Sequence, residues 1–454
     1  MSWTTGQGSD SSLYEKFLKE FYFPGWVDTQ NNLCTTRKVF RRRSTPLKGK
    51  YAVIAIRTGR TGGISAIPPS QIGNLASSIT SGAPSLPTPG YQPVDNAFVR
   101  PKIMMFAVGI AQDTIDVSQG GDKAAFMASI DFEMQGAKVD AANYEDLTCY
   151  KGGSTTLAAI TQIVSTTVIE VDNSYYFYKG KSISFYHTAG DWFATKVITA
   201  VDHSLRRVTY SGAITVITSD TVVTTGARPA TGTASVDLYG LEPWGLDTMV
   251  SASNPTLKEI NGTARYLGID RSTLPEWQSV EIDANAAFSY SAAQQVLDQI
   301  HDLSGGDPTV AFTTRTTRRS IAVKFAYGGS SETGTTQTRF MDSIKYKGGL
   351  VARKEDRHGA ESDDWMRLND EIPFVLDRYA SHDYENSNGT IFFVDTRHLY
   401  EAIVTDWKWW APQGRILREA SNSNSFGLVA HAYKYFERVL DAPNTCGKLH
   451  NITV

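Results

Sequence analysis

The stretch from residue 122 to residue 153 constrains the fold of this chain more than any other. Its small and apolar residues recur at the i, i+4, i+8 and i+11 spacing of one helix face, at Phe126, Ile130, Met134, Ala137 and Ala141. Asp122 can cap the first turn, and Gly152-Gly153 can end the last one in a left-handed conformation. At about 1.5 Å per residue, this helix would be roughly 43 Å long. Because this apolar face is narrow, we expect a long helix that is held by other elements packed along it and is not surrounded by a hydrophobic core.

Length and composition are those of a globular chain. The 454 residues are enough for roughly two to four domains, and 41% of them are hydrophobic, which is sufficient to bury real cores. No run of about 18 apolar residues occurs, and the N-terminus lacks the basic and apolar segments of a signal peptide. The sequence therefore predicts a protein that stays in the cytoplasm where it is made and has no membrane partner.

Cysteine and charge content argue against several classes of function. Cys34, Cys149 and Cys446 are far apart and odd in number, so neither a disulfide framework nor a zinc site is predicted. The net charge is −3, from 44 basic and 47 acidic residues. Domains that grip DNA or RNA carry a clear basic excess, so any contact with nucleic acid would be weak and non-specific.

The start of the chain has two features suited to contact with another molecule. Aromatic residues, Phe17 and Phe21 among them, lie at helical spacing and predict a short amphipathic helix that needs a surface to lie on. That surface could belong to a neighbouring chain. Arg41, Arg42 and Arg43 then follow one another, a run that is typical of a solvated turn, with an acidic partner surface as the alternative.

Two strand-like segments, 51–58 and 98–110, flank the part of the chain least able to form a core. Between them, residues 59–97 contain 18 Gly, Pro or Ser among 39. A connection of this length without its own structure is uncommon in a compact domain, and an isolated two-stranded arm is marginally stable in water. We therefore predict an extended hairpin that becomes ordered on another molecule.

The composition changes after the predicted helix. Between residues 155 and 236, short segments rich in Val, Ile, Thr and aromatics recur at spacings of about 8 to 12 residues, which predicts an inserted all-β barrel or sandwich. Asp172, Asp191 and Asp202 lie between these segments and are interpreted as turn residues, not as a calcium or sugar site.

A mixed α/β pattern follows from residue 237. A helix is predicted from Ser291, with Gln294 at the capping-box position and Gly305-Gly306 as its stop. A second helix is predicted from about Thr316, and strands alternate with these helices, as in a sheet flanked by helices. The end of the chain, 426–443, alternates as a strand with two usable faces.

No pattern of residues indicates chemistry. The eight histidines are dispersed, and neither a GxSxG elbow nor a phosphate-binding loop followed by a helix occurs. Trp407, Trp409 and Trp410 could stack on bases or sugars, although core or interface packing is favoured. The sequence thus predicts no catalytic, cofactor-binding or metal-binding residues, and a protein that is not an enzyme.

The order of segments, together with several local stretches, resembles the major capsid proteins of tailed bacteriophages with the HK97-type fold. KYAVIAIRTGRTGGISA (50–66) is similar to the strand that enters the extended loop of that family, and DKAAFMASIDFEMQGAKVDAANYEDL (122–147) to its spine helix. VIEVDNSYYFYKGKSISFY (168–186) is similar to the insertion barrel of some members. IPFVLDRY (372–379) and NGTIFFVDTRHLYEAIVTDWKWW (388–410) are similar to the late part of the axial domain.

This resemblance implies an α+β chain with a long spine helix, an extended β-hairpin loop, a mixed α/β axial domain and an inserted all-β barrel-like domain. The implied boundaries are an N-terminal arm (1–45), the extended loop (46–110), a peripheral domain (111–154 and 396–454) with the spine helix at 122–151, the barrel (155–236) and the axial domain (237–395). The implied inter-subunit contacts include Phe17, Phe21, Arg41, Arg42, Arg43, Arg57 and Arg60.

The resemblance also implies a function. Copies of the chain would assemble through hexamers and pentamers into an icosahedral shell around double-stranded DNA, in a virion assembled in the host cytoplasm. The implied partners are other copies, a portal protein, a separate scaffolding protein, decoration proteins and, weakly, the packaged DNA. Because residues 59–97 contain no lysine, we expect no covalent cross-link through the loop tip.

Two other functions stay open at this point. An encapsulin-like compartment would share the fold but enclose enzymes, and a groove for a cargo peptide would favour it. A carbohydrate-binding adhesin or tail surface protein would use the β-rich middle of the chain, and the tryptophans are the best support for that alternative.

Overall fold

The computed structural model describes a large part of the chain. The described residues are 35–44, 51–59, 91–111, 123–152, 157–186, 192–214, 216, 221–224, 242–255, 265–326, 362–368, 372–411, 418–419 and 427–454. The predicted aromatic helix near residues 13–21, the cap at Asp122 and most of the loop 59–97 lie outside these residues. None of the described helices is long and apolar enough to cross a membrane.

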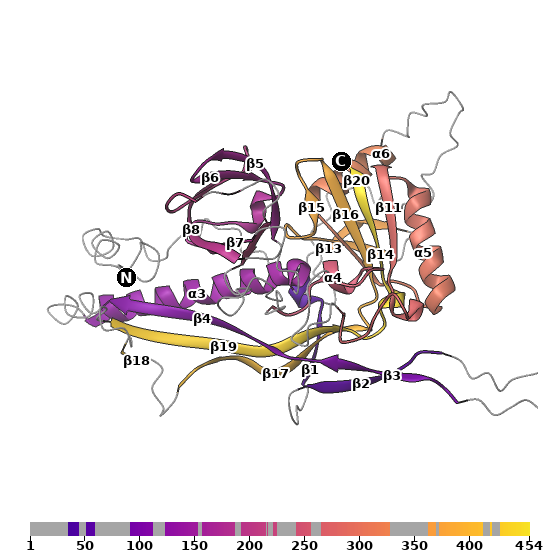
Figure 1. Cartoon of the computed structure of the whole chain (residues 1–454), viewed down its shortest axis with the longest axis horizontal. Helices are drawn as coiled ribbons and strands as arrows, with labels where there is room; N and C mark the ends of the chain where they lie inside the picture. Colours follow the sequence, from indigo (N-terminus) through magenta and orange to yellow (C-terminus); the bar gives the residue numbers. More distant parts are fainter. Residues whose placement is uncertain are drawn as a thin grey trace, which may run out of the picture.

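A long helix, α3, lies along a sheet (Figure 1). α3 spans Lys123–Lys151, the range where the apolar spacing predicts a helix. Within the described residues the sheet has the order β1-β17-β19-β18, and β4 pairs with β19. Its strands are β1 (Arg41–Ser44), β4 (Lys102–Ala111), β17 (Leu399–Trp409), β18 (Arg418–Glu419) and β19 (Gly427–Leu440). We call it the first sheet.

The last turns of α3 differ from the sequence-based expectation. Every residue from Glu145 to Tyr150 is buried, so this end of the helix is enclosed on all sides and is not merely held from outside. The apolar stripe gave no sign of this, because Glu145, Asp146 and Thr148 are polar. These three residues are buried because other polar groups pair with them.

Gly152, which follows α3, does not adopt the predicted left-handed conformation, since its φ angle is not positive, and Gly153, the other glycine of the predicted stop, lies outside the described residues. A Cβ atom at Gly152 would lie 2.1 Å from the Pro243 carbonyl oxygen and 2.3 Å from that of Thr148. A Cβ atom at Gly245 would also be too close to neighbouring backbone atoms. The Gly245 N–H donates to the Gly152 carbonyl at 2.7 Å. The chain therefore leaves α3 and returns after the barrel at adjacent points that only glycine fits.

A two-stranded ribbon extends away from the first sheet (Figure 1). It consists of β2 (Ala52–Arg57) and β3 (Val94–Val99), paired from Ala52↔Val99 to Arg57↔Val94. The single strand predicted over 98–110 is thus wrong: β3 and β4 are separate strands with different partners. They part at Pro101, which has no N–H to donate to a ladder.

The segments predicted to be β-rich form a closed barrel in the order β10-β5-β6-β9-β8-β7. The strands are β5 (Ala158–Ser165), β6 (Val168–Val171), β7 (Ser182–Tyr186), β8 (Trp192–Asp202), β9 (Arg207–Tyr210) and β10 (Thr221–Thr224). Alternate residues such as Ile169, Ile183 and Phe185 are completely buried. Closure removes the free edges that such short strands would otherwise expose.

A second sheet lies beside the barrel. In the described part of the chain its order is β11-β20-β16-β12-β14-β13, with β15 paired to β16. Its strands are β11 (Val280–Ala287), β12 (Val310–Thr313), β13 (Ser362–Leu368), β14 (Ile372–Leu376), β15 (His382–Asp383), β16 (Asn388–Val394) and β20 (Gly447–Thr453). The segment 396–454, which we expected to be wholly peripheral, is therefore divided, because β20 pairs with β11 and β16.

Two helices cover one face of the second sheet. α5 (Tyr290–Ser304) packs Ala293, Val296 and Ile300 into this core, and α6 (Arg315–Ala326) contributes Ile321. The predicted capping box at Ser291 and Gln294 is wrong, because the N-cap is Ser289 and makes no side-chain cap. The predicted stop is confirmed, since Gly305 has a φ of 66°.

Short helical segments complete the described structure. They are η1 (Thr36–Lys38), η3 (Ser174–Tyr176), α4 (Leu246–Met249), η5 (Pro275–Trp277) and η8 (Pro443–Thr445). η8 lies between β19 and β20, so it links the first sheet to the second.

We expect the chain without residues 156–235 to keep both sheets folded, because the described residues on the two sides of this segment, Gly152 and Gly245, are adjacent. The midpoint of thermal unfolding should fall, since Tyr379, which stacks on Tyr176 of the barrel side, would lose that cover. Circular dichroism during heating would measure this. Loss of any cooperative transition would contradict the barrel being a separable unit.

Candidate assembly surfaces

A buried ionic cluster joins α3 to the first sheet. Lys434 of β19 is fully buried, and its ammonium group contacts the carboxylate of Glu145 on α3. The same nitrogen lies 3.0 Å from Oε2 of Glu401 on β17, whose side chain is also buried. Lys434 occupies the helix-facing side of β19, in line with Ala430, Ala432 and Phe436, which are buried as well.

Three further groups complete the environment of Glu145. Arg438 donates to the Glu145 carbonyl at 2.9 Å and to Thr148 Oγ1 at 3.0 Å. Arg37 and the indole N–H of Trp407 reach Glu145 Oε2 at 3.1 and 3.0 Å. Burial alone would raise the pKa of Glu145, but Lys434, Arg438 and Arg37 outweigh it and lower that pKa. The carboxylate is thus held ionised inside the protein.

A second buried polar cluster joins residues 36–37, just before β1, to α3 and to the end of β14 in the second sheet. Tyr150 on α3 and the hydroxyl of Thr36 are 2.6 Å apart, and the Thr36 hydroxyl donates to Asp377 Oδ2 at 2.6 Å. The backbone N–H of Arg37 donates to Asp146 at 3.0 Å. Burial and the neighbouring Asp377 carboxyl raise the pKa of Asp146 well above its usual value. Both effects favour the neutral, protonated form of the Asp146 side chain.

The two clusters were not found from the sequence. A charged residue in an alternating strand pattern is ordinarily assigned to the solvent face, so Lys434, Glu437 and Arg438 read as exterior positions. The available signal was positional: Lys434 falls on the Ala430, Ala432, Phe436 side of the alternation, where a lysine requires a buried partner.

The predicted contact residues of the N-terminal segment lie on the edge strand of the first sheet. β1 pairs in parallel with β17, and all of its residues are exposed. Arg42 forms an ion pair with Asp406 at 3.1 Å, and the Arg43 guanidinium lies 4.1 Å from the Tyr400 ring centroid. Arg41 is exposed. Their role between subunits stays a prediction, because each is also accommodated within its own chain.

Of the remaining predicted contact residues, the structure describes one, Arg57. Arg57 ends β2 and donates from Nε to the Gly59 carbonyl at 3.0 Å, at the outer end of the described ribbon. Phe17, Phe21 and Arg60 lie outside the described residues.

Exposed apolar side chains gather on the ribbon and on β4. Along the ribbon, Tyr51, Val53 and Val94 are exposed, and Tyr91 before it is 87% exposed. On β4, Ile103 and Met105 are exposed while Met104 and Val108 face the core. Exposed residues of this size are normal when scattered, but several of them on the ribbon and on the strand that follows it make these strands a candidate contact surface.

The tryptophans of β17 pack within the protein. Trp407 and Trp409 lie with ring centroids 5.3 and 5.5 Å from that of Phe106 on β4. Trp410, just after the strand, is half exposed and meets His431 edge-on. The rings of Trp407 and Trp409 therefore pack within the protein, as the sequence analysis favoured.

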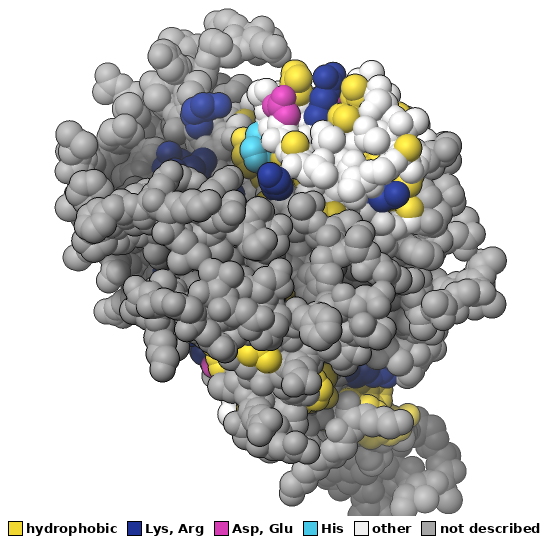
Figure 2. All heavy atoms as spheres, turned by 90° about the vertical axis from the view of Figure 1, so that its left-hand side faces the viewer, with side chains coloured by type: hydrophobic (Ala, Val, Ile, Leu, Met, Phe, Trp, Pro, Cys, Tyr) yellow, Lys and Arg dark blue, Asp and Glu magenta, His cyan; other side chains and the backbone are white. Residues whose placement is uncertain are grey.

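The barrel presents a mixed surface. Figure 2 shows hydrophobic side chains lying between polar and charged ones on the face of the barrel that it displays. Asp202 accepts hydrogen bonds from the backbone N–H groups of Ser204 and Leu205, as expected for a turn residue. Asp191 lies outside the described residues. Among the residues that the structure describes, no group of three or more His, Cys, Asp or Glu could hold a metal ion.

The barrel meets the second sheet around His382. Asn173 donates to the His382 carbonyl at 3.1 Å, and His382 Nδ1 lies 3.3 Å from the hydroxyls of both Thr314 and Thr317. Burial lowers the pKa of His382 to about 4, so the ring is neutral near pH 7.

No protein-family model matches this sequence, and no curated protein matches it either. The chain is similar in structure to phage capsid proteins over nearly its whole length. One is in the capsid asymmetric unit of cyanophage A-1(L), with 11% identity, a TM-score of 0.49, and coverage of 98% of this chain and 99% of that one. Another is in the capsid of the native GTA particle, with 9% identity, a TM-score of 0.44 and coverage of 98% and 99%.

An encapsulin complex gives a similar result. The holo-SrpI encapsulin complex from Synechococcus elongatus matches with 7% identity, a TM-score of 0.40, and coverage of 98% of this chain and 96% of that one.

Replacing Lys434 by Met should lower the free energy of unfolding by about 3–5 kcal/mol, because Glu145 and Glu401 would lose a buried counter-charge. Lys408→Met on the same sheet is the control, since Lys408 is exposed and its loss should cost less than about 0.5 kcal/mol. Urea unfolding followed by fluorescence measures both. Equal stability of the two variants would contradict the structural role of the cluster.

Acid should destabilise the protein through His382. With a folded pKa of about 4 against an ordinary value of 6.5, the unfolded chain binds the extra proton first as pH falls. The stability present above pH ~6.5 should therefore decrease towards pH ~4, by at most about 3 kcal/mol from this residue. His382→Asn retains a polar partner for the threonines but cannot titrate, so its unfolding free energy should depend less on pH in this window. If the unfolding free energies of the two proteins changed equally with pH, a contribution from His382 would be excluded.

Proposed function

We propose that this chain is the major capsid protein of a tailed bacteriophage, a structural protein of the α+β, HK97-type fold that assembles into an icosahedral shell around double-stranded DNA. The observation that carries the proposal is the β2–β3 ribbon, which is incomplete in a single chain. It is held to the rest of the protein at its base, where Ala97 and Val99 are buried and the Phe98 N–H donates to the Leu267 carbonyl at 2.8 Å.

The ribbon exposes Tyr51 and Val53 near its base and Val94 at its outer end, on a pair of strands with no further described strand beside it. Two strands without a third strand or a covering helix are marginal in water. A second copy of the chain that covers the ribbon would remove this exposed surface. Because the ribbon and the surface that receives it differ, the contact is heterologous, and heterologous contacts generate rings and closed shells.

The frame behind the ribbon is suited to transmitting load. α3 and β19 run together along the molecule, and the ionic cluster around Glu145 fixes one against the other (Figure 1). Separating them would leave buried charges without partners, which is strongly unfavourable. The long helix thereby acts as the spine of a rigid plate, to which the ribbon and the second sheet are attached.

The net charge of the chain is compatible with a shell that encloses DNA without binding it tightly. A net charge of −3 and the absence of a basic excess favour weak, non-specific contact with the packaged DNA. No catalytic role is included in the proposal, which describes a structural protein.

We assign the parts of the chain accordingly. Residues 1–45 form the N-terminal arm, 46–110 the extended loop, 111–154 with most of 396–454 the peripheral domain, 155–236 the inserted barrel and 237–395 the axial domain, to which β20 is added. Arg41, Arg42, Arg43 and Arg57, together with Phe17, Phe21 and Arg60, are proposed to contact neighbouring copies.

The proposed partners are other copies of the chain in hexamers and pentamers, a portal protein, a separate scaffolding protein and decoration proteins. The proposed location is the virion, with assembly in the host cytoplasm.

Electron microscopy and sedimentation of the purified protein test this proposal. We expect closed, uniform shells, or free hexamers and pentamers that close when a scaffolding protein is supplied. Particles whose contents are digested by nuclease only after disruption would indicate a genome container, whereas enclosed protein would indicate a compartment for enzymes. A protein that stays monomeric under all conditions, with scaffold present, would contradict a shell-forming function.

Shortening the loop tests the ribbon specifically. Replacing residues 60–91 by Asn-Gly should leave the midpoint of thermal unfolding unchanged, because Thr58 and Pro93 already close the described end of the ribbon with a 3.0 Å hydrogen bond. The variant should form no closed shell in the same microscopy assay. Normal shells from this variant would exclude the loop as an assembly element.

A further inference from the structure

The outer side of α5 has no partner within the described part of the chain. The helix buries Ala293, Val296 and Ile300 against the second sheet. On its other side Asp298 and Asp302 are exposed, and Leu303 is 64% exposed, the largest exposure of any leucine that the structure describes. The Asp298 carboxylate accepts a hydrogen bond from Gln294 Nε2 at 2.9 Å, whereas the Asp302 side chain forms no ion pair or hydrogen bond with any described residue. A large apolar side chain beside carboxylates that have no described ion-pair partner marks this side as a contact surface.

A groove of about 430 Å³ lies along this surface. Its floor is apolar, made by Leu297 of α5 together with Pro308 and Ile372, and all three are buried. Its rim carries Asp298, Asp302 and Asp307, with His301 Nδ1 at 3.3 Å from Asp307 Oδ1. The groove therefore suits an occupant with an aliphatic stem and a cationic end, and arginine has both.

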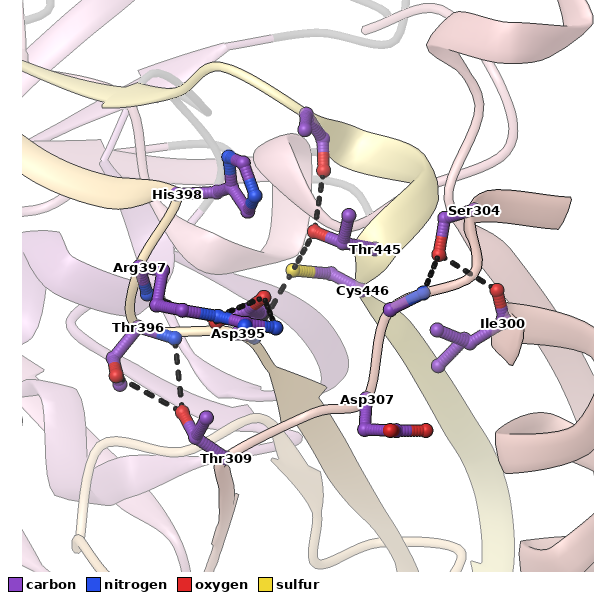
Figure 3. A network of polar contacts seen from close by, with 12 residues as sticks. Ile300, Ser304, Asp307, Thr309, Asp395, Thr396, Arg397, His398, Thr445 and Cys446 are labelled. Carbon is purple, nitrogen blue, oxygen red and sulfur yellow. Dashed lines mark hydrogen bonds and ion pairs between the residues drawn. The ribbon is translucent and has the colours of Figure 1, made fainter.

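The rim is held in place at the end of α5. Figure 3 shows Asp307 between two anchored points of the chain. On one side, the Ser304 hydroxyl donates to the Ile300 carbonyl at 2.7 Å and accepts from the Gly306 N–H at 3.0 Å. On the other, Thr309 Oγ1 accepts from the Thr396 N–H at 3.0 Å. A site on a fixed element loses little conformational entropy when it is occupied.

The complementary surface is on α6 of the same chain. Arg315 and Arg319 are exposed, and neither forms an ion pair with a described residue. Burial and the neighbouring Arg315 lower the pKa of Arg318, which reflects the excess of positive charge here. Arg315 and Arg319 are four residues apart, as are Asp298 and Asp302, so both pairs repeat at the same distance of about 6 Å along their helices.

The two surfaces of one chain lie at opposite ends of β12. The groove is formed where the chain leaves α5 and enters β12, at Asp307 and Pro308. α6 begins only after β12 has crossed the sheet, at Arg315. A second copy of the chain can present its arginines to this groove.

We propose that the groove on α5 receives the arginine row of α6 from the next copy of this chain in a capsomer ring. The contact rests on the proposed shell function and adds to it a specific pairing between the second sheets of neighbouring copies. Each copy uses the groove of α5 at one end of β12 and α6 at the other end, so the contact repeats around a ring without a free end. Exposed charges of this kind act mainly on register and on association rate, and salt weakens them.

Charge reversal tests the contact. The pair Asp298→Arg and Asp302→Arg reverses the charge of the α5 groove, and the pair Arg315→Asp and Arg319→Asp reverses the charge of the α6 surface. Each double variant should form capsomers and shells at least tenfold less well than the wild type at low salt. The chain with all four substitutions restores opposite charges at every contact and should recover assembly. Glu276→Arg with Glu385→Arg, two exposed acidic residues outside the groove, is the matched control and should assemble normally.

Sedimentation velocity and electron microscopy give the yield of rings and shells, and circular dichroism during heating shows that each variant is folded. Normal assembly of either double variant would overturn the contact while leaving the shell function intact. Failure of the folded fourfold variant to recover would also overturn it, because the effect would then not depend on pairing. A wild-type protein without any self-association would overturn both the contact and the shell function.

Discussion

The contact between Lys434 and Glu145 is the interaction on which the rest of the structure depends. It lies between the long helix and β19, the longest described strand, and Glu401, Arg438 and Arg37 join it from β17, β19 and the segment before β1. Such a cluster contributes little net stability compared with apolar packing, but a misaligned version would leave charges buried without partners. It therefore fixes the position of α3 along β19, and thereby the direction in which the helix, the sheet and the ribbon point.

This rigidity contrasts with the surfaces around it. The ribbon, the outer side of β4 and the groove on α5 all expose groups that a single chain does not satisfy, whereas the junctions between α3, the barrel and the second sheet are closely fitted. Gly152 and Gly245 leave no room for a side chain, and Thr36, Tyr150 and Asp377 share one short hydrogen-bonded series. A protein with a rigid interior and exposed groups without partners on its surface is suited to many identical contacts. In such contacts the binding free energy is spread over a large area and not concentrated in one site.

Much of the framework could be predicted from residue patterns, and the reasons for the failures are physical. The range of α3 and the strands of the barrel follow from periodicity, which reports which side of an element is apolar. The same signal cannot show that Glu145, Asp146 and Lys434 are buried, because it assigns charge to the surface by default. It also merged β3 with β4, since the effect of Pro101 is on hydrogen bonding and not on hydrophobicity. The groove on α5 combines Leu297, Pro308 and Ile372, which only the folded sheet brings together, so no local pattern contained it.

The position of the last strand has a consequence for synthesis on the ribosome. β20 is among the final residues of the chain, yet it lies between β11 and β16 inside the second sheet, and β19 just before it is the centre of the first. Neither sheet can be completed until β19 and β20 have been made and have left the exit tunnel of the ribosome. A shorter nascent chain therefore lacks the finished surfaces of both sheets, even where several such chains grow close together. The order of strands thus holds back contacts between incomplete copies.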